Sequence, residues 1–112
     1  MDEHQWIKEF PGAVTVCDQN GIILEMNDQS ANMFQERGGK LQGLSLWDCH
    51  PDPARTKLTL LMEQRKSNVY TIEKKGLKKL VYQTPWYKGG QYSGFLEIVL
   101  DLPEVIPHFI RD

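Results

Sequence analysis

The chain has 112 residues, with 13 Lys and Arg against 15 Asp and Glu, which gives a formal net charge of −2. This length corresponds to one domain, and the near balance of charge excludes the basic footprint of a nucleic-acid-binding domain. No apolar run approaches the roughly 20 residues of a membrane-spanning helix, and the N-terminus lacks the pattern of a signal peptide. We therefore expect one cytoplasmic domain without nucleic-acid or membrane partners.

The first third of the chain predicts two short helices around a β-hairpin. The expected elements are a helix within residues 2–10, strands over 13–17 and 22–26, and a helix ending near Phe34. Asn20-Gly21 favours a tight turn between the two strands, because these residues tolerate the positive φ that such a turn requires. Asn27 or Asp28 is a suitable N-terminal cap for the second helix.

The rest of the chain predicts one longer helix and three strands. Apolar residues recur at helical spacing from Ala54 to Met62, so a helix is expected from Ala54 to about Lys66. The expected strands cover residues 68–74, 77–87 and 92–102. Alternation along the last strand places Leu96 and Ile98 on one face, and we expect that face to point toward the helices.

These elements predict an α+β fold class. Two strands near the N-terminus and three at the C-terminal end can form one five-stranded antiparallel sheet, with the short helices packed on one face. The helices and the sheet would then enclose a concavity, which is where small molecules bind in many domains.

Several motifs in this order resemble a PAS domain. They are Val14-x-Val16-x-Asp18-x-Asn20-Gly21-x-Ile23-Leu24-x-Met26-Asn27, then Ala31, Met33 and Phe34, then Gly39-x-Leu41-x-Gly43-x-Ser45-Leu46, and Gly94 to Val99 in the last strand. The resemblance covers residues 7–102. It divides the chain into an N-terminal helical segment over 1–12, the PAS domain over 13–102 and a tail over 103–112.

The resemblance implies a sensory or signal-transduction module that holds a small ligand between its sheet and its helices. The residues expected to line that pocket are Phe34, Leu46, Trp47, His50, Leu58, Leu61, Tyr70, Tyr82, Leu96 and Ile98. Because these side chains are mostly apolar, we expect a small apolar ligand. Apolar residues that line a pocket look the same as residues that fill a core, so a ligand-free dimerisation or protein-interaction module is the alternative.

The N-terminal segment carries the candidate dimer interface. Trp6, Ile7 and Phe10 lie at spacings that share one side of a helix, and an exposed apolar stripe of this kind needs a partner. Only residues 103–112 follow the last expected strand, and two prolines there oppose a continuous helix toward an output domain. We therefore expect a homodimer. The chain is then either a stand-alone PAS protein that acts through a separate signalling partner, such as a kinase or another effector, or a fragment of a longer signalling protein.

Catalytic, metal and cofactor sites are not expected. Cys49 is preceded by Asp48 and followed by His50-Pro51, which departs from the Asn-Cys-Arg-Phe-Leu motif of flavin-binding light sensors. Haem-binding PAS domains take a histidine from the long helix, whereas His50 precedes that helix here. Adjacent Cys49 and His50 rarely direct their side chains at one another, so they do not form a nucleophile and base. We expect a non-enzyme without haem, flavin or metal.

Overall fold

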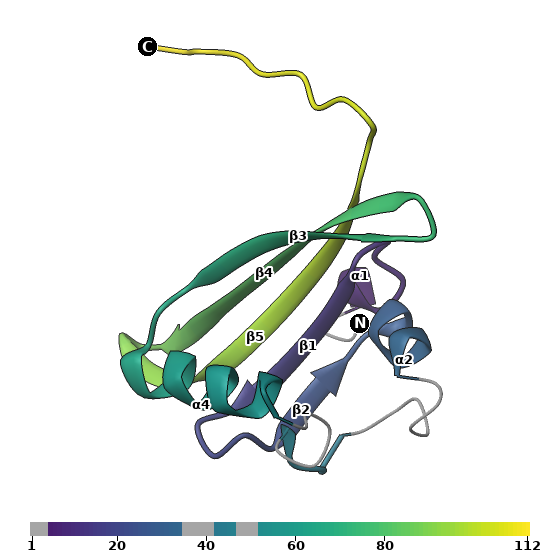
Figure 1. The fold of residues 1–112 in the computed structure, drawn as a ribbon. Helices are drawn as coiled ribbons and strands as arrows, with labels where there is room; N and C mark the ends of the chain where they lie inside the picture. The colour runs from purple at the N-terminus through teal and green to yellow at the C-terminus, as the bar shows by residue number, and fades with distance from the viewer. Residues whose placement is uncertain (1–4, 35–41, 47–51) are drawn as a thin grey trace.

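The computed structural model describes residues 5–34, 42–46 and 52–112. Its elements are α1 (Gln5–Lys8), β1 (Ala13–Asp18), β2 (Ile23–Met26), α2 (Asp28–Met33), α4 (Ala54–Gln64), β3 (Asn68–Lys74), β4 (Leu77–Lys88) and β5 (Gln91–Leu102). The strands form one antiparallel sheet in the order β2-β1-β5-β4-β3. In Figure 1, α4 crosses in front of this sheet and α2 lies beside β2. The predicted α+β fold class and five-stranded sheet are confirmed.

Local signals account for the ends of these elements. Gly21 has a φ of 81°, which the tight turn between β1 and β2 requires. Asn27 caps α2 by accepting a hydrogen bond from the Ser30 amide. Helix α4 ends at Gln64, two residues earlier than predicted, because Arg65 adopts a left-handed conformation with a φ of 54°.

The hydrophobic core lies between the sheet and α4. Cys17, Ile23 and Phe95 contribute from the strands, while Leu46, Leu58 and Met62 contribute from the helical side. Val81 and Val99, which pair in the sheet, form a second buried cluster with Ala13. No helix among the described residues is long and apolar enough to cross a membrane.

The prediction that Leu96 and Ile98 face the helices is wrong. Phe95 pairs with the buried Cys17, so the alternate residues Phe95, Glu97 and Val99 occupy the helix-facing side of β5. Leu96 and Ile98 share the opposite face with Leu100. Both faces of β5 carry large apolar side chains, and alternation alone therefore does not distinguish them.

Gly94 allows β5 to pass closely over β1. An added Cβ at this position would overlap the Cys17 carbonyl oxygen, and the φ of Gly94 is 152°. Trp86 Nε1 donates a hydrogen bond to the same oxygen at 2.9 Å. A residue without a side chain is thus required where β1, β4 and β5 meet.

A buried amide side chain, that of Asn27, joins β1 to α2. Its Oδ1 accepts hydrogen bonds from the Val14 amide at 2.9 Å and from the Ser30 amide at 3.1 Å. Asn27 is only 5% exposed. Both acceptor positions of the amide oxygen are therefore used to hold the start of α2 against β1.

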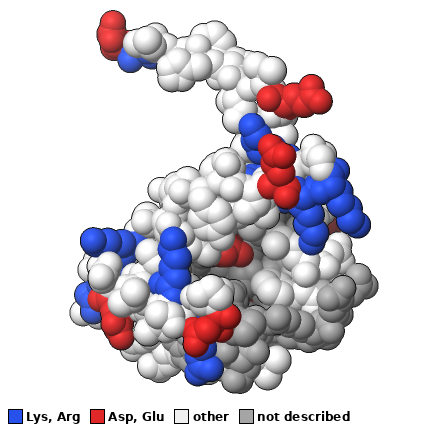
Figure 2. All heavy atoms as spheres, in the orientation of Figure 1, with Lys and Arg blue, Asp and Glu red and all other residues white. Residues whose placement is uncertain are grey.

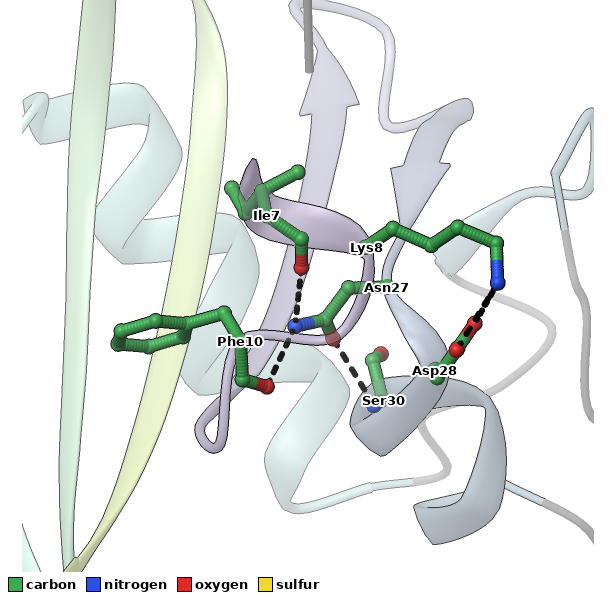
Figure 3. A network of polar contacts seen from close by, with 6 residues as sticks. All are labelled: Ile7, Lys8, Phe10, Asn27, Asp28 and Ser30. Atoms are coloured by element: carbon green, nitrogen blue, oxygen red, sulfur yellow. Dashed lines mark hydrogen bonds and ion pairs between the residues drawn. The ribbon is translucent and has the colours of Figure 1, made fainter. Parts of the chain in front are cut away.

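The nitrogen of the same amide holds the N-terminal segment, residues 5–12. Asn27 Nδ2 lies 3.0 Å from the Ile7 carbonyl oxygen, 2.7 Å from that of Gly12 and 3.5 Å from that of Phe10. Figure 3 shows this amide between the segment that contains Ile7 and Phe10 and the first turn of α2. A surface ion pair from Lys8 to Asp28, 3.1 Å long, joins the same two elements.

Residues 103–112 contain neither helix nor strand and extend away from the sheet (Figure 1). Their large apolar side chains, Val105, Ile106, Phe109 and Ile110, are 56–85% exposed.

We expect Gly94→Ala to lower the free energy of unfolding by about 3 kcal/mol, since the new Cβ must displace β1 or β5. Urea unfolding measures the change. Gly90→Ala is the matched control: Gly90 also has a positive φ, but no atom lies within 4 Å of an added Cβ, so about 1 kcal/mol is expected. Equal losses in the two variants would contradict the close approach of the strands.

We expect Asn27→Asp to loosen the N-terminal segment, because a carboxylate oxygen replaces the nitrogen that donates to Ile7 and Gly12. Buried acceptors would then face each other, and a loss of about 3 kcal/mol in the free energy of unfolding is expected. Hydrogen exchange at residues 5–12 should accelerate. Asp28→Asn, which removes the exposed Lys8 pair and the acidic charge in the first turn of α2, should cost at most about 1 kcal/mol. Equal effects of the two variants would argue against the role of Asn27.

Candidate functional site

A cavity of about 30 Å³ lies between the sheet and the helical side of the domain. From the helical side it is lined by Phe34, Leu46 and Leu58, and from the sheet by Thr15, Cys17, Ile23, Gln83, Phe95, Leu96 and Glu97. Figure 2 shows that this face is hollowed, with acidic atoms visible at the bottom of the hollow. Glu97 is the acidic residue among those that line the cavity.

The size of the cavity limits what fits inside it. A bound water needs about 10–15 Å³, whereas a cavity that takes up benzene is about 150 Å³. The cavity of about 30 Å³ therefore suits one small group. A larger ligand would have to extend from this space into the open hollow.

Three polar side chains cross the sheet beside the cavity. Asn68 Nδ2 donates a hydrogen bond to Gln83 Oε1 at 2.9 Å, and Gln83 Nε2 donates to Glu97 Oε2 at 2.8 Å. These residues are register partners on β3, β4 and β5, so they share one face of the sheet. We call Asn68, Gln83 and Glu97 the polar row.

Two ionisable side chains near the cavity are kept neutral. Burial raises the pKa of the Cys17 thiol from 9.0 to about 11, an effect that a backbone hydrogen bond from Phe95 only partly offsets. Burial also raises the pKa of Tyr70, and the negative charge of Glu97 raises it further. The raised pKa values keep the thiol and the nearby phenol neutral to well above pH 7, and Glu97 is the acidic residue among the described lining residues.

The cavity wall is connected to the N-terminal segment. The hydroxyl of Thr15, a residue that lines the cavity, is hydrogen-bonded to the Ser30 hydroxyl in the first turn of α2. The amide of Ser30 donates in turn to Asn27, whose side chain holds Ile7. A displacement at Thr15 can thus reach α1 through two residues.

The structure brings together part of the predicted pocket. The cavity is lined by four of the predicted residues, Phe34, Leu46, Leu58 and Leu96. Leu96 is among them because it lies in β5 between Phe95 and Glu97, which also line the cavity. Leu61 packs against the core cluster beside it.

The remaining predicted pocket residues lie elsewhere or outside the described part. Tyr70 is on the helix-facing side of the edge strand β3, paired with Val81. Tyr82 and Ile98 pair with each other on the opposite face. Trp47 and His50, together with Cys49, fall outside the described residues.

Sequence reasoning missed the polar lining formed by Thr15, Gln83 and Glu97. The lining was expected to be apolar, and that expectation needs correction. The available signal was a single polar residue between apolar neighbours, as Glu97 stands between Leu96 and Ile98. When it is not known which face of a strand points to the core, such a residue is interpreted equally well as solvent-exposed.

The candidate interface residues differ in their exposure. Trp6 is 69% exposed and packs edge-on against Phe10, with ring centres 6.4 Å apart. Ile7 and Phe10 are half-buried against their own chain. Ile7 also lines a second cavity of about 170 Å³, between α1 and the residues Val14 and Val16. Trp6 is therefore the member of the three that presents most of its surface to a partner.

Metal-binding clusters are absent from the described residues: no three His, Cys, Asp or Glu side chains there could hold an ion together. His108 lies in the exposed tail. His4 and His50 belong to the parts of the chain outside the description.

The chain is similar in fold to several solved domains. A C-terminal domain from Streptococcus mutans superposes with a TM-score of 0.71 at 23% identity, over 85% of this chain and 78% of that one. The PAS domain of Bordetella pertussis BvgS gives 0.64 at 19% identity, over 88% and 82%. A sensory box sensor histidine kinase from Vibrio cholerae gives 0.61 at 14% identity, over 87% and 85%.

The sequence itself matches one family model. No curated protein matches the chain by sequence. The family model described as PAS fold matches residues 7–73, which include most of the N-terminal segment, the hairpin, α2, α4 and nearly all of β3. This match covers more than half of the chain, so the chain belongs to the PAS fold family.

Proposed function

We propose that this chain is a signal-transduction module that binds a small ligand in the cavity between its sheet and α4. The observation that carries the proposal is the solvent-facing cavity with apolar walls and a polar row beside it. A PAS domain from Bordetella pertussis and a sensor histidine kinase domain from Vibrio cholerae share the fold, which supports a signalling role with a kinase or another effector as partner. The chain acts as a binding module and not as an enzyme.

The signal would leave the cavity through the first turn of α2. The Thr15 and Ser30 side chains can pack in more than one arrangement. A ligand that contacts Thr15 binds one of these arrangements better than another, and so increases the population of that arrangement. Asn27 transmits this preference to residues 5–12. Helix α1 is only four residues long, so a small change in these hydrogen bonds can release it.

We further propose that the ligand is neither haem nor flavin. The lining contains no histidine among the described residues, and the cavity of about 30 Å³ suits one small group rather than a large ring system. An absorption spectrum of protein purified from its source checks this part of the proposal, because a Soret or flavin band would overturn it.

Native mass spectrometry tests ligand binding. Protein purified from its source should carry a small molecule that is absent after denaturation, and Leu58→Trp should abolish its retention by filling the cavity. Leu60→Trp is the matched control, since Leu60 lies on the same helix but is 49% exposed and should leave retention unchanged. Circular dichroism verifies that both variants fold. A source protein that is always free of bound molecules would contradict the proposal.

The second candidate function is association with a second copy of the chain. It is favoured by the sheet face opposite α4, where Tyr82 and Val69 pair and are 40% and 50% exposed, with Leu96, Ile98 and Leu100 alongside. Large apolar surfaces of this kind mark interaction sites in soluble proteins. Ligand binding and association through the opposite face are compatible functions.

Light scattering after size exclusion tests this association. We expect a dimer that Val69→Glu converts to a monomer, because a charge then enters the shared apolar face. Ile72→Glu is the control, since Ile72 is exposed on the same strand but on its other face. Deleting residues 1–10 should leave the dimer intact. A dimer lost on deletion and kept in Val69→Glu would place the interface on the N-terminal segment.

A further inference from the structure

The direction of the hydrogen bonds in the polar row is set at its Glu97 end. An ionised carboxylate only accepts hydrogen bonds, so Gln83 must turn its Nε2 toward Glu97 and its Oε1 toward Asn68. Asn68 then donates from its Nδ2. The row therefore ends at the cavity with an acceptor that carries a negative charge.

Glu97 has acceptor capacity left over. A carboxylate offers about four lone-pair sites, and within the described part of the chain Glu97 receives one side-chain hydrogen bond, from Gln83. The ion pairs formed there join Lys8 to Asp28 and Lys79 to Asp101, so no cation of the described residues neutralises Glu97. The Glu97 side chain is half-buried beside apolar walls, so its remaining acceptor sites gain from a hydrogen-bond donor.

Among the described residues, the other polar groups that line the cavity are weaker partners for a cation than a carboxylate is. The Thr15 hydroxyl is engaged with Ser30. The Cys17 thiol stays neutral and is at most a weak donor. Among the described lining residues, the strongest polar feature is thus a carboxylate, which disfavours anions and favours N–H donors.

We propose that the ligand is a small organic cation whose N–H groups bind the Glu97 carboxylate while its apolar part contacts Phe34, Leu46 and Leu58. This inference rests on the proposed function, and it replaces the apolar ligand expected from the sequence with a charged one. A planar amidinium or guanidinium group matches a carboxylate best, because two parallel N–H donors meet its two oxygens. Glu97 is then the residue that determines ligand specificity.

Three probes of nearly equal size and different charge test the inference. Acetamidinium, acetamide and acetate are titrated at pH 7 into the ¹⁵N-labelled full chain, and the amide resonances of the cavity residues are followed by NMR. We expect acetamidinium to bind at least about tenfold more tightly than acetamide, in keeping with a charge-assisted hydrogen bond. Acetate should produce no saturable shifts at these residues.

Glu97→Gln should remove the preference for acetamidinium, because the amide keeps the shape of Glu97 and its hydrogen bond from Gln83 but not the charge. Asp101→Asn is the matched control: it also removes a carboxylate from the helix-facing side of β5, but one paired with Lys79 outside the cavity lining, and it should leave the preference intact. The comparison of the three probes on the unaltered chain holds even if a variant does not fold.

The outcomes separate the ligand class from ligand binding itself. Equal binding of acetamidinium and acetamide at the cavity, or a preference that survives in Glu97→Gln, overturns the cationic ligand while ligand binding stands. Binding of none of the three probes also overturns the cationic ligand, and the molecule retained by the source protein then decides on the proposed function separately.

Discussion

The arrangement of this domain depends most on the hydrogen bonds made by the side chain of Asn27. One buried amide satisfies the backbone of β1, the first turn of α2 and the carbonyl groups of the N-terminal segment. No other side chain of this length offers a double acceptor and a double donor together: aspartate lacks the donor, and leucine lacks both. Buried backbone N–H and C=O groups need hydrogen-bond partners. Loss of this amide would therefore leave backbone groups of three elements without their hydrogen bonds.

Much of the fold could be predicted because its signals are local. Asn20-Gly21 specifies the turn, Asn27 specifies a cap, and the spacing from Ala54 to Met62 specifies α4. The facing of β5 could not be predicted, because Leu96 and Phe95 are equally apolar and the decision lies with β1, some eighty residues away. The second role of Asn27, in holding residues 5–12, depends on a chain reversal that no local pattern contains.

The residues of the candidate site also fall into a predictable and an unpredictable group. Phe34, Leu46 and Leu58 were predicted, because apolar residues on the helical side of a small domain can be buried only against the sheet. The polar row was not predicted, because Asn68, Gln83 and Glu97 become neighbours only once the register of β3, β4 and β5 is known. The role of a charged residue in a strand depends on its neighbours in the paired strands. The sequence of one strand does not contain this information.

The strand order also governs when the domain can form during synthesis. β1 is made early, yet it pairs with β5, which is the last strand to be made. Until residues near Phe95 leave the ribosome, Cys17 and Ile23 lack the partner that buries them, and one edge of β1 stays open. Such non-local pairing slows folding and leaves apolar strand edges exposed to other chains in the interval. A nascent chain halted before β5 would therefore be a substrate for chaperones, even though it already contains α2, α4 and the four strands β1 to β4.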